Sequence, residues 1–232
     1  MTTTPLIDQP LGLLARTLPG ATQVFHEFQL DFCCGGKHSL REAAASKGLD
    51  AQTIAARLEA LKGIEAGDGR DWTRVPVDVL IDHILTRYHA RLREQVPELI
   101  RLARRVEQVH GDRPECPRGL ADHLEAMQQE LESHMLKEEQ VLFPMLLRGM
   151  SGMAGGPIAV MRAEHDQHGQ ELRRLEELTG GITLPRGACN TWRALYLGLA
   201  TLREELMEHI HLENNILFEG LNPVRATEAS HA

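Results

Sequence analysis

Four long stretches of the chain carry hydrophobic residues at alternating steps of three and four, the spacing of a helix that buries one face. They run over residues 76–110, 117–147, 157–178 and 188–218. Signals for β-strands are nearly absent. Four long helices with short connections predict an all-α fold, an antiparallel four-helix bundle. Helix-breaking residues bound or interrupt these stretches, namely Pro76, Pro97 (a predicted kink), Pro144, Gly180-Gly181 and Asn222-Pro223.

The amino-terminal part has shorter helical patterns, over residues 8–18, 20–28, 39–47 and 50–62. Asp8 and Asp50 are candidate helix caps, and Ser39-Leu-Arg-Glu42 is a candidate capping box. A stretch rich in glycine and charge follows from Lys62 and predicts a domain boundary. We therefore expect a small helical domain over residues 1–67 and the bundle over residues 68–232.

Composition narrows the class of protein. The net charge is −8 and the pI is near 5.8, which argues against binding to nucleic acid. No apolar run is long enough for a membrane span, and the amino terminus does not resemble a secretory signal. These features predict a cytoplasmic protein with reduced thiols and no membrane partner.

One ten-residue phrase occurs twice, as HMLKEEQVLF from His134 and as HIHLENNILF from His209. Both copies fit H-x-x-x-E-x-x-[VI]-L-F, and both lie where the predicted core stripe expects hydrophobic residues. A buried carboxylate needs a compensating partner, and histidine and glutamate four residues apart point to one side of a helix, where a cation can bind both. We attribute a third such pair, His38 and Glu42, to chance. The two stripes contain Leu120, Leu124, Met127, Leu131, His134, Glu138, Val141 and Met145, and Leu195, Leu199, Leu202, Leu206, His209, Glu213 and Ile216.

The other two long helices contribute histidines to the same predicted core. Their stripes contain Ile81, Leu85, Tyr88, Leu92, Val96 and Leu99, next to His89, and Ile158, Met161, His165, His168, Leu172 and Leu175. His89 precedes His134 by 45 residues and His165 precedes His209 by 44, so these two histidines preserve the duplication. His83 is predicted on the surface. His168 is predicted to be a core histidine or one that contacts the ligands.

The predicted metal ligands are His89, His134, Glu138, His165, His209 and Glu213. Six ligands are too many for one structural zinc ion. They suit two non-haem iron ions per chain, bridged by both glutamates and by an oxo or hydroxo group, with manganese as the next candidate metal. The Glu-x-x-His pairs of ferritin-like proteins are not matched, since Glu208 and His211 have no symmetric partner. The site is therefore predicted to be hemerythrin-like.

With these residues the chain resembles the bacterial Repair of Iron Centres family over essentially its full length. The shared motifs are DFCCGGKHSL, RYHARLREQVPEL, SHMLKEEQVLFPML, GPIAVMRAEHD and HIHLENNILF. The resemblance implies the same six ligands and a protein that supplies iron to iron–sulfur proteins damaged by nitrosative and oxidative stress. One departure is Glu219 after Phe218, where the family often has proline.

Further residues are candidates for moving iron. Cys33 and Cys34 form a soft thiol pair beside two glycines. This thiol pair could receive iron, bind a cluster or contact a partner. Glu130 and Glu164 could relay iron outward, or they could be solvated surface residues. Cys116 and Cys189 are interpreted as inert thiols.

Three functions share this site: a non-enzymatic iron donor, a di-iron nitric oxide reductase, and a sensor or carrier that binds oxygen or nitric oxide. The cysteine pair favours the first, because a simple carrier has no use for it. A homodimer is also compatible with the sequence.

Overall fold

The computed structural model describes residues 4–61 and 71–220. Over these residues the chain is helical with no β-strand, which confirms the predicted all-α class. Among them, no helix is both long and apolar enough to cross a bilayer. The predicted linker after Lys62, the domain boundary at residue 67 and the helix end at Asn222-Pro223 lie outside the described residues.

The chain divides into two compact units, which we describe separately. One unit contains residues 81–206. The other contains residues 1–80 together with residues 207–232, so the end of the last long helix is grouped with the amino-terminal helices. The predicted division into residues 1–67 and 68–232 stays a prediction.

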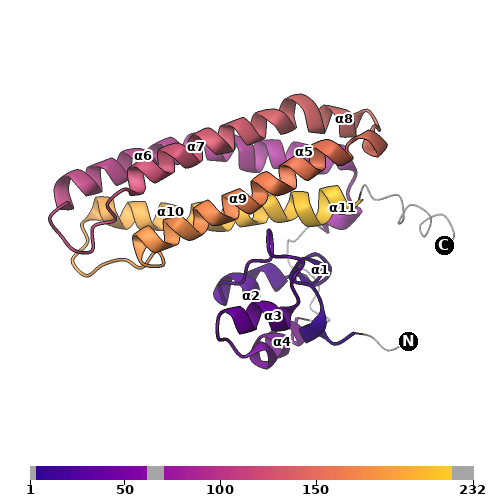
Figure 1. The fold of residues 1–232 in the computed structure, drawn as a ribbon, viewed down its shortest axis with the longest axis horizontal. Helices are drawn as coiled ribbons and strands as arrows, with labels where there is room; N and C mark the ends of the chain where they lie inside the picture. Colours follow the sequence, from indigo (N-terminus) through magenta and orange to yellow (C-terminus); the bar gives the residue numbers. More distant parts are fainter. Residues whose placement is uncertain (1–3, 62–70, 221–232) are drawn as a thin grey trace. The chain divides into compact units, whose positions relative to one another are not determined.

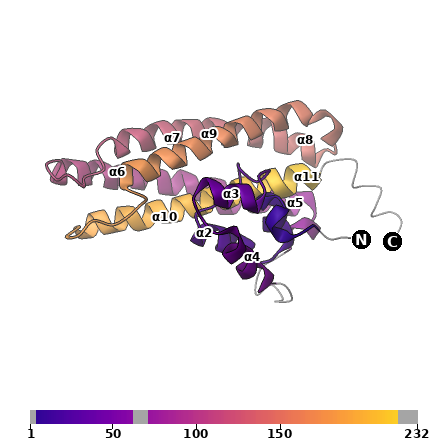
Figure 2. The ribbon, with the colours of Figure 1, turned by 60° about the horizontal axis from the view of Figure 1, so that its bottom comes forward.

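The long helical segments of the larger unit run side by side (Figures 1 and 2). The first segment contains α5, η3 and α6. The second contains α7, which continues through the π-helical segment η4 into α8. The third and fourth are α9 and α10. Gly180, in the left-handed conformation, ends α9 as predicted. The bounds are α5 Val77–His83, η3 Ile84–His89, α6 Ala90–His110, α7 Leu120–Lys137, η4 Glu138–Leu142, α8 Phe143–Leu147, α9 Gly155–Thr179 and α10 Asn190–His211.

Cross-helix contacts show that neighbouring segments are antiparallel. Early residues of one helix meet late residues of the next, as in the ion pairs that Arg93 makes with Glu132 and Arg104 with Glu125. The same order joins α7 to α9 and the first segment to α10. These contacts are His134–Glu164, His123–Glu171, Arg87–Glu205 and Gln95–Gly198. The predicted antiparallel bundle is thus observed.

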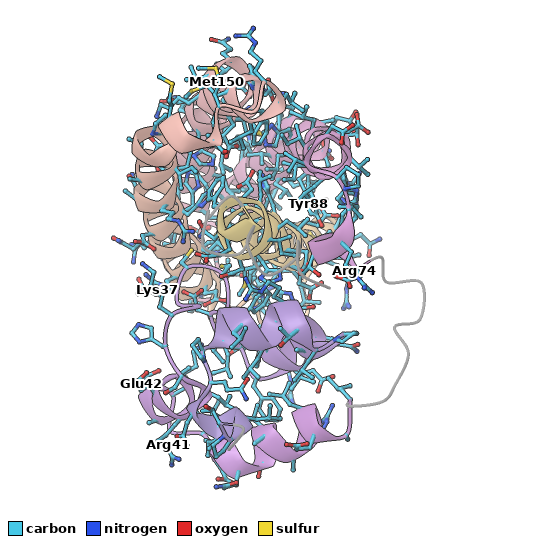
Figure 3. The ribbon with its side chains drawn as sticks, turned by 90° about the vertical axis from the view of Figure 1, so that its right-hand side faces the viewer. Lys37, Arg41, Glu42, Arg74, Tyr88 and Met150 are labelled. Atoms are coloured by element: carbon cyan, nitrogen blue, oxygen red, sulfur yellow. The ribbon has the colours of Figure 1, made fainter. Side chains whose placement is uncertain are left out.

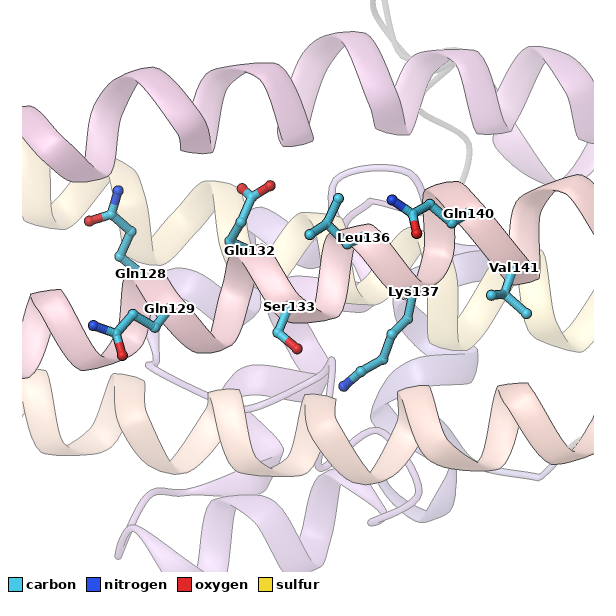
Figure 4. Close-up of a pocket in the computed structure, with 8 residues that line it drawn as sticks. All are labelled: Gln128, Gln129, Glu132, Ser133, Leu136, Lys137, Gln140 and Val141. Atoms are coloured by element: carbon cyan, nitrogen blue, oxygen red, sulfur yellow. The ribbon is translucent and has the colours of Figure 1, made fainter.

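Three segments that carry predicted ligands are π-helical, with one extra residue in the turn: η3, η4 and η6, the last over Leu212–Leu217. The extra residue moves the buried stripe by one position. After Glu138 the next core residue is therefore Leu142, whereas Val141 is 49% exposed. Figure 4 shows Val141 among the residues that line a groove on the outer face of α7 and η4.

The predicted core positions Val141, Met145 and Ile216 are accordingly wrong. Met145 and Ile216 are only half-buried, and Leu146 and Leu217 are buried in their place. The prediction assumed a regular α-helical repeat, which a π-helical turn interrupts. The predicted core positions Leu85 and Ile158 are also only half-buried, although the stripe beyond η3 is buried as predicted.

Four short helices pack around their own apolar core in the other unit: α1 Leu11–Thr17, α2 Ala21–Glu27, α3 Leu40–Ser46 and α4 Ala51–Glu59. The capping box of Ser39 and Glu42 and the Asp50 cap are confirmed. Figure 3 shows Glu42 and Arg41 at the solvent-exposed start of α3. Asp8 does not cap α1, because it ends the short helix η1 (Leu6–Asp8) and its carboxylate binds Arg41.

Candidate metal centre

The larger unit brings four of the predicted ligands together in its interior. His89 ends η3, His134 lies in the last turn of α7, Glu138 begins η4 and His165 lies in α9. None of the four side chains is more than a few per cent exposed. A carboxylate and three imidazoles in an apolar core are costly unless they are compensated, so their burial together indicates a polar centre.

Glu138 lies between two imidazoles. Its Oε2 atom is 3.3 Å from His89 Nε2 and 3.5 Å from His134 Nε2. The Nε2 atoms of His134 and His165 are 3.0 Å apart. Each of His134, Glu138 and His165 offers a ligand atom within 4.8 Å of the others.

These separations fit shared metal coordination. Two nitrogen ligands at about 2.1 Å from one ion and at a right angle to each other are separated by about 3.0 Å. That is the spacing of the two Nε2 atoms of His134 and His165. The donor set of imidazole nitrogen and carboxylate oxygen is compatible with iron, and the residues present therefore fit the predicted cofactor.

Two of the predicted ligand histidines are held in place by carboxylates that accept from Nδ1. His89 Nδ1 lies 2.8 Å from Glu139, and His134 Nδ1 lies 2.9 Å from Glu164. In metal sites such contacts direct Nε2 toward the ion and increase the basicity of the ring. Glu164 is also paired with Lys137.

Glu139 is a residue that the sequence prediction missed, and its charge is well stabilised. Partial burial opposes ionisation, but hydrogen bonds from Arg93 and His89 lower the pKa of Glu139 below its ordinary value. Arg93 binds both Glu132 and Glu139. The sequence signal that was available is the second glutamate of the phrase, directly after Glu138.

The second copy of the phrase also brings its histidine and glutamate side chains together. His209 lies near the end of α10 and Glu213 lies in η6, and their side chains meet at 2.9 Å between Nε2 and Oε1. Both side chains are buried. The two copies therefore share a histidine, a glutamate one turn later and a π-helical turn around the glutamate.

The remaining predicted residues have distinct positions. His168 is buried and packs edge-on against the His134 ring, with centroids 4.8 Å apart. His83 is half-buried and packs against Tyr88. Glu130 is half-buried, and its Oε2 atom is enclosed with no hydrogen-bond partner among the described residues.

Cys33 and Cys34 are not in a disulfide, and their Sγ atoms are 3.6 Å apart. Their loop is held by η6, because Asn214 and Asn215 donate to the carbonyl oxygens of Cys33 and Phe32. The sequence prediction did not identify these two asparagines, whose signal was their position directly after Glu213.

Comparison with known proteins identifies the family of this chain. Residues 80–221 match the hemerythrin HHE cation binding domain, and residues 7–62 match a domain of unknown function, DUF542. Three proteins named iron-sulfur cluster repair protein YtfE are each 54% identical over 211 residues, 91% of this chain and 95% of theirs. They come from Yersinia pseudotuberculosis serotype O:1b (strain IP 31758), Y. pseudotuberculosis serotype O:3 (strain YPIII) and Yersinia pestis (strain Pestoides F).

The chain belongs to the Repair of Iron Centres family. The family resemblance seen in the sequence is thereby confirmed, as is the hemerythrin-like character of the bundle. Within this family member, the hemerythrin match includes all six predicted ligands, and the amino-terminal match includes both adjacent cysteines. The matched domain binds cations, and the described residues include buried histidine and glutamate groups that could hold a metal ion.

Proposed function

We propose that this protein repairs damaged iron–sulfur clusters by donating iron from a dinuclear centre. In this proposal His89, His134, Glu138, His165, His209 and Glu213 hold the two ions, and both glutamates bridge them. The observation that carries the proposal is the position of Glu138, whose buried carboxylate faces two imidazoles from different helices. The names of the relatives support cluster repair as the purpose of the centre.

The equivalence of the two phrases supports the inclusion of His209 and Glu213. A buried glutamate next to a buried histidine needs the same compensation in either copy. Iron bound by such ligands supplies a cation that carboxylates can release, because a carboxylate can change between bridging and terminal binding. The proteins in need of repair are the acceptors, and the iron is the cargo.

A route for the cargo starts at the half-buried carboxylates near His134. Glu130 lies one helical turn before His134 on α7, and one of its oxygens is enclosed without a partner among the described residues. Glu164 contacts His134 directly. We propose that these carboxylates accept iron as it leaves the histidines.

Transfer to a depleted acceptor tests this function. The iron-loaded protein is incubated without oxygen with a cluster-free iron–sulfur enzyme and sulfide, and both acceptor activity and donor iron are measured. We expect activity to return as the donor loses iron. The Glu138→Ala variant should hold little iron and restore nothing, whereas His83→Ala should behave as the unchanged protein.

Two results would contradict donation. Activity that returns while the donor keeps its iron would exclude the bound iron as the source. Turnover of nitric oxide with an electron donor, or reversible binding of oxygen or nitric oxide with all iron retained, would favour the reductase or the sensor in its place. A cytoplasmic location and a homodimer stay predictions from the sequence.

A further inference from the structure

The loop that follows α2 and carries the sequence DFCCGG has an unusual concentration of metal-binding groups. Asp31, Cys33 and Cys34 each place a possible ligand atom within 4.8 Å of the other two. Cys33 is buried, and the other two side chains are half-buried. None of these residues belongs to the histidine and glutamate centre.

The distances in this cluster match one face of a tetrahedral metal site. Two sulfur ligands at about 2.3 Å from a tetrahedral ion are separated by about 3.8 Å, and a sulfur and a carboxylate oxygen by about 3.6 Å. The corresponding distances here are 3.6 Å between the Sγ atoms of Cys33 and Cys34 and 3.3 Å between Asp31 Oδ1 and Cys33 Sγ.

We propose that Asp31, Cys33 and Cys34 form a second cation site, which binds one divalent ion of borderline softness, such as Fe²⁺ or Zn²⁺. Two thiolates and one carboxylate occupy three positions of a tetrahedron and leave the fourth for water or for an exchanging ligand. Binding breaks two S–H bonds and releases both protons to solvent as two metal–sulfur bonds form.

The loop is built to hold these three groups together before an ion arrives. Asp31 Oδ1 accepts from the backbone N–H groups of Cys34 and Gly35, both at 3.0 Å. These bonds fix the Asp31 carboxylate beside the two thiols. Gly35 and Gly36 permit the tight path, because a Cβ at either would lie 2.7 Å from a carbonyl oxygen of the loop.

Burial shields the Cys33 sulfur from reagents in solvent, so Cys33 does not have the exposure of a reactive cysteine. A metal ion bound in the loop would supply the positive charge that stabilises both thiolates.

Binding of Co²⁺ tests the site, because thiolate ligation of Co²⁺ gives a charge-transfer absorption that histidine and carboxylate do not give. The full-length, iron-loaded protein is titrated without oxygen, and its iron content is measured in the same samples. We expect one Co²⁺ per chain with this absorption, and the release of two protons. Cys33→Ser and Cys34→Ser should each weaken binding on the order of 100-fold.

Two further variants separate ligation from loop structure. Asp31→Asn keeps an oxygen that accepts from the backbone but loses the charge, so it should weaken Co²⁺ binding with the helix content unchanged. Cys189→Ser removes an exposed thiol elsewhere and should change nothing. Because Cys33 is buried and its variant could fold poorly, the half-exposed Cys34 gives the second measurement.

Absence of the thiolate absorption in the folded protein would overturn the second site, as would equal absorption in Cys34→Ser. The proposed iron donor does not depend on this result. Its own ligands are tested by the iron content of the same samples, so either proposal can fail while the other stands.

Discussion

The Oε2 atom of Glu138 lies 3.3 Å from His89 Nε2, although 49 residues separate the two along the chain. The contact joins η3 to η4, two π-helical segments of antiparallel neighbours. It places the carboxylate of one repeated phrase against a histidine that has no such phrase around it. A carboxylate so deeply buried is expected to need a compensating cation.

Replacing Glu139 should weaken metal binding without removing a ligand. Glu139→Ala deletes the acceptor for His89 Nδ1, and loss of such a partner typically lowers metal affinity by about 10–100-fold. Competition with a chelator measures the affinity. Glu132→Ala is the matched control, because Glu132 also binds Arg93. An equal loss of metal affinity in both variants would show that the affinity depends on the ion pairs of Arg93 and not on the contact with His89.

The π-helical turn at η4 predicts opposite outcomes for adjacent residues. Leu142 is 1% exposed, so Leu142→Ala should lower the free energy of unfolding by about 2–5 kcal/mol. Val141 is 49% exposed, and Val141→Ala should change it by less than about 0.5 kcal/mol. Denaturant unfolding at equal metal content measures both. The reverse order would show that the helix keeps a regular α-helical register.

The capping box of α3 should give a stability difference that depends on pH. The backbone N–H of Ser39, and then its hydroxyl, lower the pKa of Glu42 below its ordinary value of 4.5. The ionised form is favoured in the folded state, so its contribution is present above that ordinary value. It is lost as the pH falls through the lower folded pKa.

Ser39→Ala removes the hydroxyl and should lower the free energy of unfolding by about 1 kcal/mol near neutral pH. The difference between this variant and the unchanged protein should decrease at a pH below the folded pKa of Glu42. Urea unfolding at the two pH values measures it. A difference that increases on acidification would contradict the assigned pairing.

Gly12 should not accept even a methyl group. A Cβ there would lie 2.9 Å from Asn215 Cγ and 3.2 Å from the carbonyl oxygen of Gly36. Such overpacking costs about 1–3 kcal/mol, so Gly12→Ala should lower the unfolding midpoint in denaturant. Gly156→Ala is the control, because its Cβ would meet nothing within 4 Å. Equal midpoints for the two variants would contradict this packing.

The sequence predicted much of the fold because each long helix has a regular apolar stripe. The capping box at Ser39, the cap at Asp50 and the end of α9 at Gly180 also followed from local residue chemistry. Local chemistry misled at Asp8, whose carboxylate binds Arg41, 33 residues away. A sequence pattern does not show such a long-range competitor.

The candidate site was predictable as a set of residue types but not in its supporting contacts. Repetition identified His134 with Glu138, and its spacing selected His89 over His83. The π-helical turns have no period in the sequence, so the shift from Val141 to Leu142 had no signal. The contacts of Glu139 and Glu164 with histidines depend on how neighbouring helices align, which the pattern of a single helix does not determine.

The hydrogen bond from Asn214 to the Cys33 carbonyl has a mechanical consequence. Asn214 shares a peptide bond with Glu213, so one short stretch of backbone carries both the buried carboxylate and the side chain that holds the cysteine loop. A shift of the Cys33 carbonyl would act on the residue directly next to Glu213. Chemical change at the thiols would in this way have a route to that carboxylate through one peptide bond.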